Sequence, residues 1–193
     1  MEPETTNAAD ARRQLEQRRT QAQAEQDNLA LLAEVRAVLS EVNPDLKWRT
    51  PEPAVESGSL CKKPFDRVDG AGTAILTSGG AFGAISDADW PRAWAAVKAV
   101  AAKRGYGDEN VLKDEPGGHQ VSVYDKDGSE LSVGTGVNTT ATVYGACYLE
   151  DPSADGPSTT GAGAGWREAG ARGVWSCPDT GSRLGRMREL DGW

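Results

Sequence analysis

The residues best suited to chemistry in this chain are three cysteines and a single histidine. Cys61 and Cys147 each fall in a segment that predicts a strand, whereas Cys177 falls in a stretch rich in glycine and arginine. The cysteines form no Cys-x-x-Cys pair and no group with histidine, so the sequence predicts no metal site. A Cys61–Cys147 bridge would close a long loop and contribute about 4–5 kcal/mol in the chain-entropy model. The alternative is three unrelated thiols.

Any catalytic triad in this chain would have to use His119, because there is no other histidine. No serine or cysteine stands at a diagnostic spacing from it. The glycine clusters at residues 79–83 and 134–136 lack the Gly-Lys-Ser/Thr of a phosphate loop and the third glycine of a dinucleotide site. We therefore predict a non-enzymatic protein with no catalytic residues and no cofactor, and a hydrolase that uses His119 is the less favoured reading.

Three tryptophans lie near the ends of predicted elements and are candidates for a ligand groove. They are Trp48, Trp90 and Trp94. Large aromatic side chains at such positions either line a binding groove or pack at the edge of the core. Both readings stay open on the sequence alone.

Composition excludes several classes of partner. The chain has 193 residues and a formal net charge of −8, so no basic face is expected to neutralise a nucleic acid. No apolar run approaches the roughly 20 residues that a membrane helix needs. The first residues are acidic and polar, so they predict no signal peptide. Either the protein is cytoplasmic, or the sequence begins after an export signal.

The stretch over residues 86–150 predicts one helix and then three strands, around which the rest is organised. Ser86 and Asp89 resemble a capping box, and Gly105 is a natural helix stop. Residues 119–133 alternate between apolar and polar around a hairpin turn, and residues 140–149 predict a third strand. Because successive side chains of a strand point to opposite faces of the sheet, we expect Cys147 to lie on the face toward the helix.

Residues 7–42 predict a long N-terminal helix whose first half is almost wholly polar. We expect residues 1–28 to form a solvated helical arm, residues 29–150 an α+β domain, and residues 151–193 a disordered tail rich in glycine, proline and arginine. Two further strands are predicted before the central helix, the first over residues 59–65. The order α-β-β-α-β-β-β predicts helices packed on one face of a mostly antiparallel sheet.

Several of these segments together resemble the LppA-like lipoproteins of actinobacteria. The resemblance covers roughly residues 28–150 and is carried by the apolar helix over residues 29–42, Ser59-Leu60-Cys61, residues 81–85, Asp89-Trp90-Pro91 and Tyr144-Gly145-Ala146-Cys147. It implies a small exported domain, tethered by an N-terminal lipidated cysteine and without a known enzyme activity. It also implies that Cys61 and Cys147 form a structural disulfide. No lipobox cysteine stands in this sequence, so membrane attachment would need a lipid anchor outside it.

Two hypotheses for the function follow. The first is a non-enzymatic, extracytoplasmic domain of the cell envelope that binds an envelope protein or a small ligand. The second is a cytoplasmic, acidic interaction protein of phage or prophage origin, which predicts reduced cysteines.

Overall fold

The computed structural model describes residues 7–151, which form three helices and nine strands. The helices are α1 (Ala8–Glu16), α2 (Gln21–Val42) and α3 (Trp90–Ala102). The strands are β1 (Lys47–Trp48), β2 (Ala54–Leu60), β3 (Ala71–Thr77), β4 (Ala81–Phe82), β5 (Asp108–Glu115), β6 (Gly118–Tyr124), β7 (Glu130–Thr135), β8 (Asn138–Tyr144) and β9 (Tyr148–Leu149). The predicted α+β class is confirmed.

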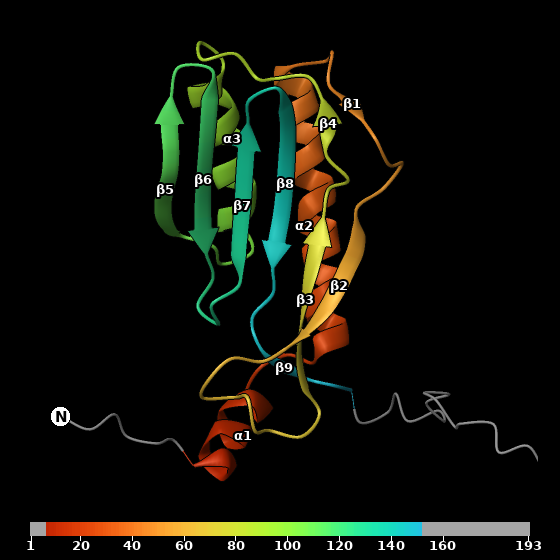
Figure 1. The fold of residues 1–193 in the computed structure, drawn as a ribbon, viewed down its shortest axis with the longest axis vertical. Coiled ribbons are helices and arrows are strands. Elements are labelled where there is room, and N and C mark those ends of the chain that lie inside the picture. Colours follow the sequence, from red (N-terminus) through yellow and green to blue (C-terminus); the bar gives the residue numbers. More distant parts are fainter. Residues whose placement is uncertain (1–6, 152–193) are drawn as a thin grey trace, which may run out of the picture. The chain divides into compact units, whose positions relative to one another are not determined.

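The strands form one antiparallel sheet, in the order β1-β4-β8-β7-β6-β5 (Figure 1). β3 also pairs with β8 and carries β2 and β9. α2 and α3 lie side by side against one face of the sheet (Figure 1). The predicted layer of helices on one face is therefore confirmed.

The core lies between these two helices and the sheet. α2 supplies Leu31, Leu32, Val35 and Leu39, and α3 supplies Trp90, Ala93, Trp94 and Val97. The strands supply alternate apolar residues, such as Val121 and Val123 in β6 and Leu131 and Val133 in β7. The residues that alternate with these point to the other face of the sheet. One row of paired residues there, which runs across four strands, carries only hydroxyl side chains: Ser122, Ser132, Thr142 and Thr77. This row of the second face is thus polar, and no helix of the described residues covers that face.

The predicted continuous helix over residues 7–42 is interrupted, so this detail of the prediction was wrong. Asn7 is the N-cap of α1, but α1 ends at Glu16 and α2 starts after a second cap. The Thr20 side chain accepts from the N–H of Gln23, and the Gln23 side chain accepts from the N–H of Thr20. This reciprocal capping box starts a new helix and lets the chain change direction.

α1 is not fully solvated, in contrast to the expected arm. Its Ala11 and Leu15 are buried and pack in a small cluster with Cys61, Val68 and Cys147. Two apolar residues four positions apart suffice for this contact because they share one side of the helix. The division of the chain at residue 28 remains a prediction.

Two predicted strands end earlier than expected. β2 stops at Leu60, so Cys61 lies in the following loop. The strand predicted over residues 140–149 is split into β8 and β9 at Gly145, whose N–H donates to the Ala74 carbonyl at 2.8 Å. A Cβ at Gly145 would lie 2.9 Å from that oxygen, so only glycine permits the approach. Because the strand breaks here, Cys147 packs toward α1 and not toward α3.

β5 was not predicted, since its residues are all exposed and, apart from Val111 and Leu112, polar. Within residues 7–151, no helix has the length and apolar character needed to span a bilayer. Cys177 and the predicted tail beyond Asp151 lie outside the described residues.

The packing of α1 can be tested with Leu15→Ala, since Leu15 is buried in the small cluster. We expect the free energy of unfolding, measured by urea denaturation, to fall by about 2–5 kcal/mol. Gln14→Ala on the exposed side of α1 is the control and should change it by less than about 0.5 kcal/mol. Equal, small effects of both substitutions would mean that α1 does not pack on the domain.

Candidate ligand site at the disulfide end

Cys61 and Cys147 form a disulfide, with their Cα atoms 5.7 Å apart. This separation lies within the usual range for the bond. The bond joins the loop after β2 to the link between β8 and β9, 86 positions apart in the sequence. It therefore fixes two segments at one end of the sheet, where α1 also packs (Figure 1).

Arg18, in the short link between α1 and α2, ties this end together. Its Nη1 donates to the Cys147 carbonyl oxygen at 3.0 Å, and its Nε lies 3.7 Å from an Asp127 carboxylate oxygen. Its guanidinium also lies 5.0 Å from the centre of the Phe65 ring, in the range of a cation–π contact. The side chain is only 17% exposed, so its charge is held in one place.

A cavity of about 400 Å³ opens beside Arg18, between the loop after β2 and the sheet. Ile75 and Tyr144, which face each other in the register of β3 and β8, lie in its wall. The loop contributes Lys62 and Lys63. Further wall residues include Thr73, Phe65, Asp127, Gly128, Glu130 and Ala146. The cavity thus combines apolar, hydroxyl and charged groups, as ligand sites commonly do.

The charged groups of the cavity differ in how far they are already paired. Arg18 and Asp127 contact each other, and Glu130 accepts from the Ser122 hydroxyl at 2.6 Å. Lys62 and Lys63 are exposed, and neither has an acidic partner among the described residues. The two lysines are therefore the groups of this cavity with charge left to offer a ligand.

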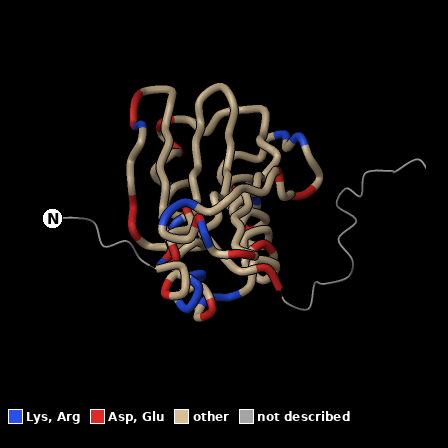
Figure 2. Tube along the Cα trace, turned by 60° about the horizontal axis from the view of Figure 1, so that its bottom comes forward, with Lys and Arg blue, Asp and Glu red and all other residues tan. Residues whose placement is uncertain are grey.

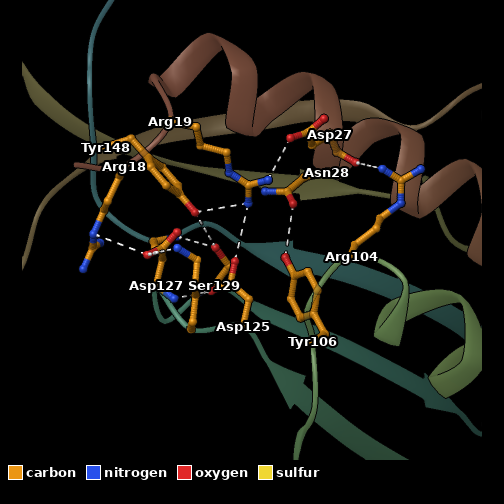
Figure 3. A network of polar contacts seen from close by, with 12 residues as sticks. Arg18, Arg19, Asp27, Asn28, Arg104, Tyr106, Asp125, Asp127, Ser129 and Tyr148 are labelled. Carbon is orange, nitrogen blue, oxygen red and sulfur yellow. Dashed lines mark hydrogen bonds and ion pairs between the residues drawn. The ribbon is translucent and has the colours of Figure 1, made fainter. Parts of the chain in front are cut away.

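A polar network next to Arg18 fixes the start of α2 (Figure 3). Arg19 donates to Asp27 at 2.8 Å, to the Tyr148 hydroxyl at 3.3 Å and to Asp125 at 3.4 Å. The Tyr148 hydroxyl also lies 2.9 Å from Ser129 Oγ. These contacts connect α2, the β6–β7 turn and β9.

The same network extends to Tyr106, whose hydroxyl donates to Asn28 Oδ1 at 3.1 Å (Figure 3). Burial raises the pKa of Tyr106, and the negative charge of Asp125 adds to the effect. The phenol therefore stays neutral and serves as a hydrogen-bond donor. The network supports the cavity and offers no reactive group of its own.

The three candidate groove tryptophans do not line this cavity. Trp90 and Trp94 are buried in the core and stack, with their ring centres 6.1 Å apart. Trp48 lies on β1, where its Nε1 donates to the Ser40 hydroxyl and the Arg36 guanidinium lies 4.6 Å from its ring centre. The structure brings Trp90 and Trp94 together with His119, and it places Trp48 on another element.

His119 is 8% exposed and is enclosed by two carboxylates and an indole. Its Nδ1 lies 2.6 Å from Asp114 Oδ1, and its Nε2 lies 3.0 Å from Asp87 Oδ1. The ring stacks on Trp90 with centroids 5.0 Å apart. A carboxylate oxygen thus lies within hydrogen-bond distance of each ring nitrogen. Neither nitrogen is then open to activate a nucleophile, so the geometry favours a structural role for His119.

The pKa of Asp87 is lowered, chiefly because the Gly117 N–H donates to its carboxylate at 2.8 Å and then because of His119. Asp87 precedes α3, whereas Gly117 and His119 belong to the β5–β6 hairpin. The carboxylate thus pins the hairpin to the start of α3. Among residues 7–151 no group of His, Cys, Asp and Glu side chains is arranged to hold a metal ion.

Sequence reasoning missed the residues that surround the cavity. Arg18 falls in the polar stretch that predicts a solvated helix, and Lys62 and Lys63 directly follow Cys61. The adjacent lysines beside a structural cysteine are the signal that was available. Tyr144 and Ile75 gave none, because their meeting depends on the strand register.

Comparison with known proteins gives one family and one solved structure. A family model described as LppA, a lipoprotein confined to pathogenic Mycobacterium, matches residues 1–151. The chain is similar to the crystal structure of LppA from Mycobacterium tuberculosis, with 20% identity and a TM-score of 0.59, over 74% of this chain and 87% of that one. At this identity the likeness concerns the fold alone. No curated protein matches.

The Asp87 contacts predict a specific pH dependence of stability. A carboxylate with a lowered pKa in the folded state stabilises the fold above its unfolded pKa of about 3.9, and the contribution is lost as the pH falls through the folded value. In Asp87→Asn, the free energy of unfolding should therefore vary less with pH below about 4. Urea denaturation at a series of pH values measures this slope. Asp66→Asn, in an exposed loop, is the control, and parallel slopes for Asp87→Asn and the wild type would contradict the prediction.

Proposed function

Because this chain belongs to the LppA lipoprotein family, we propose that it is a non-enzymatic domain of the cell envelope that binds a ligand at the disulfide end. The family assignment supports an envelope lipoprotein. We further propose that the domain lies outside the cytoplasm, that a lipid anchor on its N-terminal side attaches it to the membrane, and that it binds a ligand.

The single observation that carries the proposal is the Cys61–Cys147 disulfide. Disulfides persist in oxidising compartments and are rare in the cytoplasm, where thiols are kept reduced. Here the bond also holds the loop with Lys62 and Lys63 against the sheet, so an oxidising environment and an ordered cavity are linked. A cytoplasmic interaction protein, the alternative reading, would not maintain this bond.

The cavity beside Arg18 supports a binding function more than a catalytic one. Its acids and its arginine are engaged by neighbouring side chains, and His119 belongs to a separate cluster with Asp87 and Asp114. The ligand is expected to contact Tyr144 and the two lysines. We propose either an envelope protein or a small molecule as the partner.

Non-reducing peptide mapping by mass spectrometry tests the compartment, using protein made in its native host with its export signal. The expected result is a linked peptide that contains Cys61 and Cys147, which separates into two peptides after reduction. Free thiols at both positions, or a bridge from either one to Cys177, would contradict the proposal. Free thiols would instead favour the cytoplasmic interaction protein.

The structural value of the bond has its own test. We expect Cys61→Ser/Cys147→Ser to lower the free energy of unfolding by about 2–5 kcal/mol, because the unfolded chain loses a long-range constraint. Urea denaturation of oxidised wild type, reduced wild type and the double variant measures the change. The reduced wild type should resemble the variant, and an unchanged unfolding midpoint in both would show that the bond does not stabilise the fold.

A further inference from the structure

The loop over residues 61–67 is basic in a protein that is acidic as a whole. It contains Lys62, Lys63 and Arg67 against Asp66 alone, whereas the complete chain carries a net charge of −8. The other arginines of this end are engaged, since Arg12 and Arg13 pair with acids of α1 and Arg18 contacts Asp127. The two loop lysines therefore present a local positive charge that no described acid neutralises.

The lysines lie where an anion can also gain a second contact. They share the wall of the cavity with Tyr144, whose side chain is 46% exposed and whose hydroxyl has no partner among the described residues. Arg18 adds a fixed guanidinium to the same wall. Ammonium groups and a free phenol are suitable donors for the oxygens of a phosphate group.

An apolar side chain stands next to these donors. Leu60 is the last residue of β2 and is 86% exposed, directly before Cys61 and the two lysines. A single exposed leucine on a protein surface is ordinary. Beside two unpaired lysines, however, it completes the combination of basic and apolar contact that suits the interface of an anionic bilayer.

The position of the loop in the fold suits contact with a membrane. The loop follows the end of β2 that lies toward α1, the first described element of the chain (Figure 1). Figure 2 brings this end forward and shows several segments of Lys and Arg around it, interspersed with segments of Asp and Glu. If the domain is held from its N-terminal side, as the proposed function has it, this end is the one nearest the bilayer.

We propose that residues 60–65 and the adjoining cavity dock on the bilayer surface and take the phosphate headgroup of an anionic phospholipid. Lys62 and Lys63 bind the phosphate oxygens, Tyr144 donates from the sheet, and Leu60 contacts the acyl boundary. The domain then lies on the membrane in one orientation and is not simply suspended from a tether. This inference rests on the proposed function for its orientation, but the docking itself does not require a lipid anchor on the chain.

Vesicle co-sedimentation of the full 193-residue chain tests the docking. We expect binding to phosphatidylglycerol vesicles at low salt and much weaker binding to phosphatidylcholine vesicles. Each lysine near an anionic surface contributes about 1 kcal/mol, which is about fivefold in affinity. Lys62→Gln/Lys63→Gln should therefore lower the partition onto phosphatidylglycerol about 25-fold. Circular dichroism checks that the variant folds, which its exposed positions favour.

The matched control is Lys47→Gln/Arg49→Gln, which removes two exposed cations at and beside β1, toward the other end of the sheet (Figure 1). It should leave the partition within about twofold, because β1 follows the far end of α2, whose 22 residues span about 33 Å, and a Debye length is only about 10 Å. An equal loss in both variants would overturn the site, because binding would then follow total charge. Equal binding to both vesicle types would overturn the headgroup assignment.

A second experiment tests whether the site binds a phosphate group in a lipid bilayer or a free phosphate ion. Amide chemical shifts at residues 62–65 are followed during titration with inorganic phosphate and, separately, with phosphatidylglycerol vesicles. Tighter binding of inorganic phosphate than of the vesicles would overturn the bilayer assignment, and so would an absence of any vesicle binding. These outcomes are independent of peptide mapping, which would still report the disulfide and with it the envelope location.

Discussion

The disulfide between Cys61 and Cys147 is the constraint on which one end of the molecule depends. The small cluster around it buries Ala11, Leu15 and Val68, and this is little apolar surface with which to hold α1. The bond keeps the loop after β2 beside the link between β8 and β9, and α1 packs on the surface that results. Arg18 then donates to the Cys147 carbonyl and fixes the start of α2. The cavity exists because these segments cannot separate.

The main core does not include that bond, and its residues can be predicted from the spacing of apolar residues in the sequence. Strict alternation in β6 and β7, helical spacing in α3 and the apolar second half of α2 each identify one buried face. Such patterns predict the layer of helices on an antiparallel sheet. They fail where burial is sparse. β5 is exposed throughout and polar apart from Val111 and Leu112, and the break in the long helix depends on the Thr20–Gln23 capping box, which lies within a mostly polar stretch.

The candidate site was harder to predict than the fold, for a geometric reason. Cysteine pairing follows from the family resemblance, but the cavity needs the register that puts Ile75 opposite Tyr144 and the close approach of Gly145 to Ala74. Neither is visible in local composition. The tryptophans illustrate the converse. The sequence left two readings open for Trp90 and Trp94, a ligand groove or core packing; both are core residues, and Trp90 also stacks on His119.

The edge strand β5 matters if a lipid anchor holds copies of the domain on one surface, as the proposed function has it. Anchored molecules share two dimensions, so neighbours meet more often than they do in solution, and an exposed strand edge invites pairing between them. β5 presents the exposed apolar residues Val111 and Leu112, flanked by Asp108, Glu109, Lys113, Asp114 and Glu115, and its register shifts between Val111 and Lys113. Charge and a bulge of this kind are the usual protections against edge-to-edge aggregation. The strand that sequence patterns overlook thus carries two of the features that oppose pairing with the edge of a second copy.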